Sequence, residues 1–548
     1  MKTRKLLFFS TVTVLLWSTP ILNAQHKHGP TKTELEKVGR VKFSVSCKPA
    51  SRAQFDRAVA MLHSFWYEES GRAFSELAQK DPKCTMAHWG VAMSLYHPLW
   101  QQPLEQLLND GRAALARARA GLSSTTERER SYIGALETFY KDGPLDYRSR
   151  VRAYEEAMAQ VHARYPQDNE AAVFYALSLL GTAQALPADK TYMREKRAAS
   201  ILNKVLALEP KHPGVAHYLI HAYDSPALAN LALDAARAYA KIAPGVPHAL
   251  HMPSHIFIRL GLWEESISSN LDSEVAAKEY ARKTQMAGVW DQQLHAMDYL
   301  IYAYLQLAQD EKAKGVLDDL NRILKTSDEN FIVAYTFAAV PARYAIERRQ
   351  WSEAAALELR PKEFAWNRLP WAKAIVYFSR GIGAARQGDV AGARNVLAKL
   401  EEVKGELNGV KGYDWAAQVE IQRLAVAAWL AHAERNDREA LSLMRSSADL
   451  EDSTDKHPVT PGAIVPAREL LADLLIEVGQ PADALREFEA SLATVPNRFN
   501  GLYGAARAAE LAGNDKKAKD YYERLVALCA EECSRRELQQ AKAFLAKK

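Results

Sequence analysis

The chain has 548 residues, 48% of them hydrophobic, and a net charge of +5. Lys2, Arg4 and Lys5 at the start supply three of the positive charges, so the remainder is close to neutral. Because a nucleic-acid surface needs a dense basic face, we expect no nucleic-acid partner. The hydrophobic share is that of an ordinary soluble chain, which has enough apolar residues to bury a large core.

The first residues have the pattern of an export signal. A positive start is followed by an apolar run, Leu6 to Trp17, that is too short to span a bilayer. The segment Leu22-Asn23-Ala24 ends in a small residue and is an acceptable cleavage site. We expect 1–24 to be a cleaved signal peptide and the mature chain to be periplasmic or secreted, with no membrane span. An uncleaved anchor is the alternative, and Pro20 disfavours it because it interrupts the run.

Four cysteines are present: Cys47, Cys84, Cys529 and Cys533. An even number in an exported chain permits disulfides. We predict a Cys47–Cys84 bridge, because these residues flank a helix pair whose two ends meet in space. Cys529 and Cys533 are one helical turn apart and form a second candidate pair. The chain has no CxxC or CxxCH motif, so neither a zinc ribbon nor a c-type haem is indicated.

The body of the chain has helical periodicity throughout and no convincing alternating strand. Residues 25–50 are predicted to be a disordered lead-in to the first helices. Beyond them, small residues, an aromatic residue and a closing proline recur in the same order. Near the C-terminus these are Gly479, Ala484, Phe488 and Pro496, and the closing prolines at 210 and 244 stand 34 residues apart.

This pattern resembles the tetratricopeptide repeat family, whose unit is a pair of helices in 34 residues. The resemblance implies an all-α fold, a right-handed superhelical solenoid of stacked helix pairs. The expected divisions are N-terminal repeats with a histidine-rich concave face (51–270), divergent helical repeats (271–450), a loop (451–466) and C-terminal repeats (467–548). The segments MAHWGVAMSLYHPLW, HPGVAHYLIHAYDSP, HMPSHIFIRLGLW and KHPVTPG further resemble a group of exported bacterial repeat proteins, from which no activity carries over.

Two histidine pairs recur at the repeat spacing. A repeat that begins at Pro213 places His217 and His221 at its positions 5 and 9, and His251 and His255 follow 34 residues later. The resemblance implies that these positions of the first helix line the concave groove. Residues four apart share a helix face, so we expect all four imidazoles to converge there. A proline at 253 predicts that the second helix is kinked, or begins, between its two histidines.

Paired imidazoles at this spacing favour a transition metal. We predict one divalent ion, zinc, copper or iron, bound by three or four of His217, His221, His251, His255 and His295. The groups expected to orient the ligands or line the groove are Tyr223, Asp224, His248, Asp298 and Tyr299. The residues between the paired histidines do not form an HExxH motif, so a metalloprotease helix of that type is excluded.

Other interpretations of the same residues remain open. A metal-free groove that binds a protein or peptide would also use histidine and tyrosine, and a metal site could belong to a hydrolase or an oxidase whose substrate the sequence does not name. Core packing is expected for His63, His88 and His97, and a surface loop for His457. Arg343, Tyr344 and Glu347 form either a groove-facing polar set or a capping network. No glycine-rich phosphate loop, GxSxG motif or Cys–His nucleophile pair is found.

Overall fold

The computed structural model describes residues 37–547, apart from 100, 101, 144, 411, 530–532 and 534. The predicted signal peptide therefore lies outside the described residues. Within the described ranges every regular element is a helix, and a single isolated bridge joins Val289 to Thr326. The prediction of an all-α fold is confirmed. None of the described helices combines the length and the apolar character that a bilayer crossing requires.

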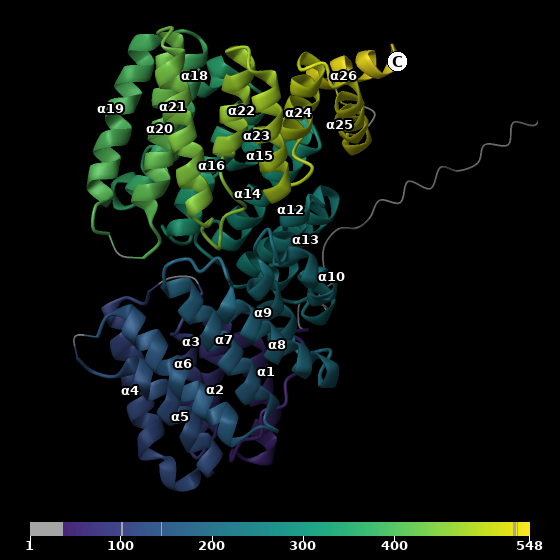
Figure 1. Ribbon diagram of the computed structural model, residues 1–548. Coiled ribbons are helices and arrows are strands. Elements are labelled where there is room, and N and C mark those ends of the chain that lie inside the picture. The colour runs from purple at the N-terminus through teal and green to yellow at the C-terminus, as the bar shows by residue number, and fades with distance from the viewer. Residues whose placement is uncertain are drawn as a thin grey trace, which may run out of the picture.

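Consecutive helices pack against one another along the chain, as expected for a solenoid of helix pairs. The first group comprises α1 (Pro49–His63), α2 (Tyr67–Lys80), α3 (Thr85–Ser94), α4 (Glu105–Ala120), α5 (Glu127–Tyr140), α6 (Tyr147–Arg164), α7 (Asn169–Ala185) and α8 (Met193–Leu208). These helices form the lower lobe in Figure 1, drawn in purple and blue.

The middle of the chain joins the two lobes (Figure 1). It comprises α9 (Pro213–Tyr223), α10 (Leu233–Ile242), α11 (Pro247–His251), α12 (Pro253–Leu260), α13 (Trp263–Lys283), α14 (Asp291–Gln306) and α15 (Asp310–Asn321). Pro213 and Pro247 each occupy a first helical turn, where a missing N–H costs nothing. The helix is interrupted between the two histidines, as the proline at 253 predicted: α11 ends at His251 and α12 begins at Pro253, with Met252 in helical conformation between them.

The remaining helices form the upper lobe of Figure 1, in green and yellow. They are α16 (Phe331–Glu347), α17 (Trp351–Ala355), α18 (Pro370–Arg386), α19 (Val390–Leu407), α20 (Trp415–Ala433), α21 (Asp437–Ser453), α22 (Ala467–Glu477), α23 (Pro481–Thr494), α24 (Phe499–Leu511), α25 (Asp515–Leu528) and α26 (Arg536–Ala546). Short 3-10 turns cover Leu122–Ser124, Ala229–Ala232 and Trp366–Arg368. Between α21 and α22 the chain crosses a long loop, which we call the covering loop (residues 454–466).

Two large hydrophobic cores follow this division. One is built from residues between Val38 and Trp290 and the other from residues between Leu294 and Ala541. A small cluster that includes Trp263 and Tyr299 lies beside them. Because α9, α11 and α12 belong to the first core and α14 to the second, the candidate site residues lie where the two cores meet.

The segment before α1 packs on the first lobe as an extended chain. Val38, Val41, Phe43 and Val45 are buried, and the Phe43 ring lies 5.0 Å from that of Tyr132, centroid to centroid. Residues 37–48 thus lead into the first helices while contributing apolar side chains to their core.

The cysteine predictions have different outcomes. The Cys47–Cys84 disulfide is present, with its Cα atoms 4.3 Å apart, and joins the lead-in segment to the start of α3. The second candidate pair is wrong: Cys529 and Cys533 are free thiols joined by a hydrogen bond. Cys529 lies just beyond the end of α25 and has an extended backbone, so it is not on the helix that the prediction assumed.

Candidate metal centre

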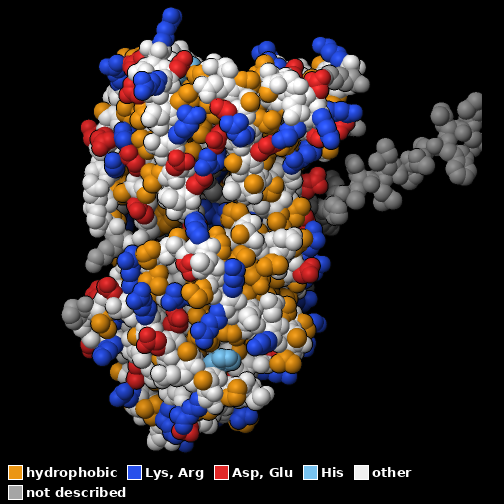
Figure 2. Space-filling view, in the orientation of Figure 1, with side chains coloured by type: hydrophobic (Ala, Val, Ile, Leu, Met, Phe, Trp, Pro, Cys, Tyr) orange, Lys and Arg blue, Asp and Glu red, His pale blue; other side chains and the backbone are white. Residues whose placement is uncertain are grey.

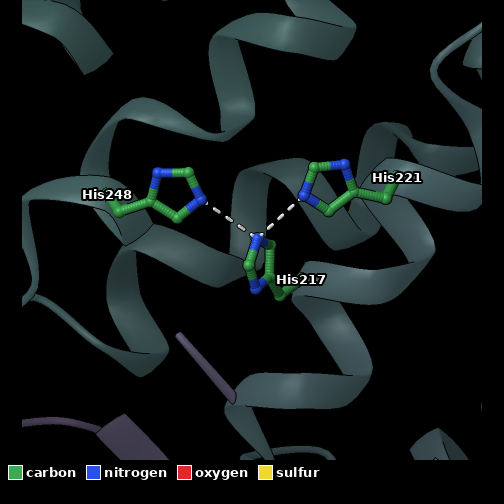
Figure 3. Close-up of side chains that lie close together, drawn as sticks. All are labelled: His217, His221 and His248. Atoms are coloured by element: carbon green, nitrogen blue, oxygen red, sulfur yellow. Dashed lines mark hydrogen bonds between the residues drawn. The ribbon is translucent and has the colours of Figure 1, made fainter. Parts of the chain in front are cut away.

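Three histidine side chains from two helices converge on one point. The Nε2 atom of His217, on α9, lies 3.1 Å from that of His221 and 3.2 Å from that of His248, on α11 (Figure 3). The ligand atoms of the three residues all lie within 4.8 Å of one another, which is close enough to hold a single metal ion. We call this set the first triad.

The tautomer of His217 is fixed by a hydrogen bond at Nδ1, the ring nitrogen that faces away from the triad. Its Nδ1 donates a hydrogen bond to the backbone carbonyl of His63 at 2.7 Å. A neutral imidazole carries one proton, so the Nε2 of His217 presents its lone pair to the other two rings. An oxygen acceptor on the far nitrogen is the usual way in which proteins orient a metal-binding histidine.

A second triad follows directly along the chain. His251 ends α11, His255 lies on α12 and His295 lies on α14, and their ligand atoms also lie within 4.8 Å of one another. The ring centroids of His251 and His295 are 4.0 Å apart. The Nε2 atoms of His251 and His255 approach to 3.1 Å.

Both rings of this close pair have a fixed tautomer. His251 Nδ1 donates to Asn270 Oδ1 at 2.7 Å, and His255 Nδ1 donates to the Asp224 carboxylate at 3.1 Å. The Asn270 amide is itself oriented, because its Nδ2 donates to the Ser266 carbonyl. Two neutral imidazoles therefore face each other lone pair to lone pair, an arrangement that is repulsive unless a cation lies between them.

A proton is a poor candidate for that cation. Burial lowers the pKa of every histidine in both triads, and neighbouring imidazoles lower most of them further. For His217 burial lowers the pKa to about 3. A metal ion is bound by the lone pairs of neutral imidazoles, so its binding does not require the histidines to be protonated. The geometry and the neutral state of the histidines therefore both suit a transition-metal site.

The two triads are neighbours and share one cavity. Rings of different triads approach to 6.2 Å between His221 and His255, and to the same distance between His248 and His251, centroid to centroid. A cavity of about 10 Å³ lies between them. Its lining combines histidines of both triads with apolar residues: His221, His248, His255, His295, Leu99, Met252, Ile332, Pro458 and Val459.

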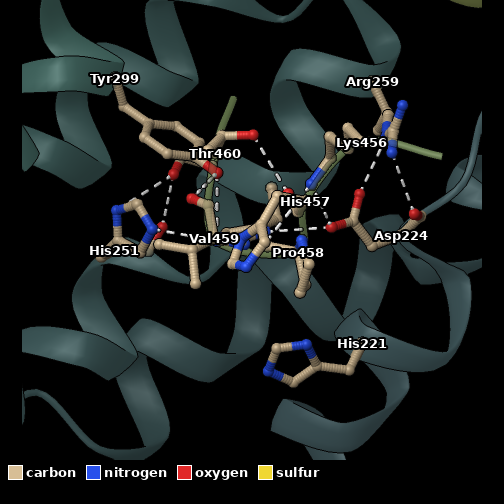
Figure 4. Close-up of polar contacts among 12 residues, drawn as sticks. His221, Asp224, His251, Arg259, Tyr299, Lys456, His457, Pro458, Val459 and Thr460 are labelled. Atoms are coloured by element: carbon tan, nitrogen blue, oxygen red, sulfur yellow. Dashed lines mark hydrogen bonds and ion pairs between the residues drawn. The ribbon is translucent and has the colours of Figure 1, made fainter. Parts of the chain in front are cut away.

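A largely buried ion-pair network supports the second triad. The Asp224 carboxylate that accepts from His255 also contacts Arg259 at 2.9 Å and Lys456 at 2.8 Å (Figure 4). Burial would raise the pKa of this carboxyl, but Lys456 and Arg259 hold it well below its usual range. Burial in turn lowers the pKa of Lys456 to about 8. Asp224 is therefore an anion that orients His255 and is already neutralised by two cations.

The histidines are enclosed by protein. His217, His251 and His255 are at most 2% exposed, and His221 is only partly exposed. Figure 2 accordingly shows only a small area of histidine colour on the face it presents. The histidines that were expected to line the concave groove are thus covered by segments from both lobes.

Two covering segments come from opposite ends of the chain. Phe65, between α1 and α2, stacks on His221 and His248 and packs edge-on against His217. The covering loop lies over the second triad, where the Val459 carbonyl accepts a hydrogen bond from Tyr299 (Figure 4). The Tyr299 hydroxyl also lies 3.3 Å from His255 Nε2.

A third group that could hold a metal has a simpler explanation. Glu170 accepts from His63 Nε2 at 2.9 Å and from His212 Nε2 at 2.8 Å, while the other ring nitrogens contact the Tyr218 hydroxyl and the Val215 N–H. Burial would raise the pKa of Glu170, but the two histidines lower it to about 2. Every ring nitrogen has a protein partner, so this set is a satisfied polar core.

The structure places some predicted residues away from the triads. The Asp298 carboxylate lies 3.7 Å from the Arg343 guanidinium and contacts no histidine in the described residues, which corrects its expected role as an orienting group. The Tyr223 hydroxyl accepts from Asn203 at 3.4 Å. His457 is buried against the Phe331 ring, 4.3 Å between centroids, so it is an anchor of the covering loop instead of a surface residue.

The polar residues of α16 have structural roles. Arg343 donates to the carbonyls of Gly462 and Ala463 and so fixes the covering loop. Glu347 accepts from Arg498 at 2.7 Å in a fully buried ion pair. These contacts fit the capping network that the sequence offered as one of two alternatives.

The sequence reasoning missed three residues of the site: Asn270, Phe65 and Lys456. Asn270 lies on α13 with no motif to single it out. Lys456 is the first residue of the KHPVTPG segment, which the sequence analysis had singled out for its resemblance. The sequence did not indicate that this lysine pairs with Asp224. Phe65 has a left-handed backbone, with φ of 54°, in the turn between two helices, a conformation that only the structure reveals.

No protein-family model matches the chain, and no curated protein matches it. Among solved structures, a tetratricopeptide repeat protein from Parabacteroides merdae is 13% identical, with a TM-score of 0.29, over 55% of this chain and 97% of that one. A human IFIT1 dimer with PPP-AAAA is 12% identical, with a TM-score of 0.35, over 81% of this chain and 90% of that one. These similarities are too weak to indicate a function, which must therefore be derived from the site.

Proposed function

We propose that the protein binds transition-metal ions through the two histidine triads. The observation that carries this proposal is the 3.1 Å approach of the His251 and His255 Nε2 atoms, each with its Nδ1 proton already donated to an oxygen. Such lone pairs attract a cation, and imidazole nitrogen suits copper, zinc and iron.

The supporting residues fit the same function. His217, His251 and His255 each have an oxygen acceptor on the nitrogen that faces away from the triad. Such partners orient metal-binding imidazoles and raise their basicity. A groove that binds peptide without metal would require the histidines to be accessible, whereas five of the six are buried.

The disulfide bears on where the protein acts. A structural Cys47–Cys84 bridge is typical of an oxidising compartment, so it supports the proposal of an exported protein. An exported metal-binding protein acquires its ion outside the cytoplasm, where thiol buffers do not compete for it.

Metal analysis tests the proposal. The purified full-length protein is stripped with a chelator, incubated separately with copper, zinc and iron, desalted, and analysed by mass spectrometry. Wild type is expected to retain at least one ion per chain of at least one metal. The His251→Ala/His255→Ala variant is expected to retain less metal than wild type, because only the first triad remains. It should keep its helical circular dichroism, since solenoid stability is spread over many helix interfaces.

A matched control is available in His432, which contacts Asp437 and Glu477 on the upper lobe, away from the triads. His432→Ala should retain the wild-type metal content. Equal metal contents in wild type and in the His251→Ala/His255→Ala variant would contradict the proposed function.

A further inference from the structure

We propose that the two triads together form one dinuclear copper centre whose reduced state binds dioxygen in the cavity between them. The inference rests on the proposed function and deepens it by naming the number of ions, the metal and the ligand. Its starting point is that the structure contains two complete sets of three imidazoles, where the sequence had predicted a single ion.

The arrangement of the triads makes the two ions one site. His248 and His251, which belong to different triads, are both on the five-residue helix α11. Two histidines of each triad line the same cavity, so ions bound to both triads would face each other across it. Paired metal ions that act on one small ligand lie about 3.5–4 Å apart, and facing rings at 6.2 Å leave room for such a pair.

The charge of the site favours copper in its monovalent state. All six ligands are neutral imidazoles, and neither triad contains a carboxylate. The nearest anion, Asp224, is already paired with Arg259 and Lys456. Two divalent ions would bring four uncompensated positive charges into a buried site, at a large desolvation cost. Two Cu(I) ions bring only half that charge.

The cavity lining agrees with this choice of metal. The Met252 side chain lines the cavity beside the histidines, and a thioether is a soft group that favours Cu(I). Hard divalent ions such as magnesium and manganese prefer carboxylate oxygens, which are missing from both triads.

The size and polarity of the cavity select the ligand. A volume of about 10 Å³ accommodates about one molecule of the size of water or a diatomic gas. Leu99, Met252, Ile332 and Val459 make the remaining lining apolar, which suits an uncharged ligand. A hydrolytic site of the kind built on two zinc ions would need room for an organic substrate beside the metals, and this cavity has none.

The two copper ions supply both of the electrons that reduce dioxygen to peroxide, so no external electron donor is needed. Each of two Cu(I) ions gives one electron to dioxygen, so that two Cu(II) ions and one peroxide dianion result, and release of dioxygen returns both electrons to copper. Copper is among the metals that proteins use for dioxygen chemistry. Peroxide bridging the two ions supplies the negative charge that the ligands lack.

Anaerobic loading followed by oxygenation tests this inference. The chelator-stripped protein is titrated with Cu(I) under argon, its copper content is measured, and the sample is then exposed to dioxygen. We expect two copper ions per chain, a strong near-ultraviolet peroxide-to-copper band after oxygenation, and no electron paramagnetic resonance signal, because two bridged Cu(II) ions couple.

A variant of one triad tests whether dioxygen binding requires both copper ions. His295→Ala removes a ligand from the second triad only and is expected to keep one copper ion. After oxidation it should lose the peroxide band and show the paramagnetic signal of a single Cu(II). His432→Ala should behave as wild type.

The outcomes separate the two proposals. Wild type that binds copper or zinc but gives no peroxide band, or an uncoupled Cu(II) signal, overturns the dinuclear dioxygen centre and leaves the proposed metal-binding function standing. Wild type that retains neither copper, zinc nor iron overturns both.

Discussion

The Nε2 atoms of His251 and His255 lie 3.1 Å apart, although the opposite nitrogen of each ring donates its proton to an oxygen. The oxygen behind His251 belongs to Asn270 and the oxygen behind His255 belongs to Asp224. These two residues therefore decide which nitrogen each imidazole offers to a metal, and substituting them tests the site without removing a ligand.

Substitution of Asn270 should weaken metal binding. Asn270→Ala leaves His251 in place but removes the acceptor that fixes its tautomer, and losses of about 10–100-fold in metal affinity are typical of such changes. Competition titration against a chromophoric chelator measures the effect. Ser266→Ala is the control, because Asn270 donates to the Ser266 backbone carbonyl and that bond is kept. Unchanged affinity in Asn270→Ala would show that this amide does not orient a ligand.

Neutralising Asp224 should destabilise the fold. Asp224→Asn leaves two largely buried cations, Arg259 and Lys456, without their counter-ion. Breaking a fully buried pair costs about 3–5 kcal/mol, and partial exposure places the expected loss at or below the lower end of that range. Urea unfolding of the metal-free protein measures the loss. The double variant Asp224→Asn/Lys456→Met removes one stranded charge and should recover part of the stability. An Asp224→Asn variant as stable as wild type would contradict the network.

Acid should destabilise the metal-free protein below about pH 6.5. Burial lowers the pKa of His97 to about 4 and the pKa values of His217 and His457 to about 3. Between these values and about 6.5 the unfolded chain binds protons that the folded chain does not, so stability is complete above that range and falls as the pH falls. The expected loss by pH 5 is about 2 kcal/mol for each such histidine.

Urea midpoints measured at pH 7.5 and pH 5 check this dependence. Metal loading should oppose the loss, because ligated imidazoles must release the ion before they bind protons. Burial raises the pKa values of Asp298 and Glu451 to about 7, so these two carboxyls offset part of the loss. A midpoint that is unchanged or higher at pH 5 would contradict the predicted dependence.

The disulfide should stabilise the first lobe without affecting the site. Cys47→Ser/Cys84→Ser releases the lead-in segment from α3 and should cost about 2–4 kcal/mol. The variant's metal content should equal that of wild type, because no triad residue contacts the bridge. Labelling of four thiols in unfolded, unreduced wild type, in place of two, would show that the bridge does not form.

The covering loop should control how fast metal leaves. His457 lies in an aromatic stack with Phe331 and Trp415, and Trp415 in turn stacks on Trp371. Trp415→Ala removes part of this anchor and should speed metal transfer to an excess of chelator several-fold, with little change in the number of ions bound. Trp429→Ala, at a buried tryptophan of the upper lobe that does not contact His457, is the control. Equal release rates for both variants and wild type would rule out the loop as the barrier.

Much of the fold was predictable because it depends on local periodicity. The 34-residue spacing of the two HxxxH pairs placed His217 and His221 on one helix, and placed His251 and His255 at the equivalent positions of the next repeat, where they lie on α11 and α12. Pro213 and Pro247 marked the starts of α9 and α11. The Cys47–Cys84 bridge was also predictable from local structure, because Cys47 precedes α1 and Cys84 follows α2, and the two ends of such a helix pair lie close together.

The division into two triads was not predictable from register alone. It depends on α11, where His248 and His251 lie three residues apart: His248 meets His217, and His251 meets His295. Asp298 is one turn from His295 on α14, which suggested an orienting role, but packing against α16 directs it to Arg343. The burial of the histidines was not predictable either, because Phe65 and Val459, which cover them, are far apart in the sequence.

Anomalous diffraction from crystals of the copper-loaded protein tests the central claim most directly. A difference map from data collected above and below the copper absorption edge locates each ion relative to the imidazoles. The account predicts one peak within the Nε2 atoms of His217, His221 and His248, and a second within those of His251, His255 and His295. No peak at either triad, or a peak only at the His63, Glu170 and His212 group, would contradict it.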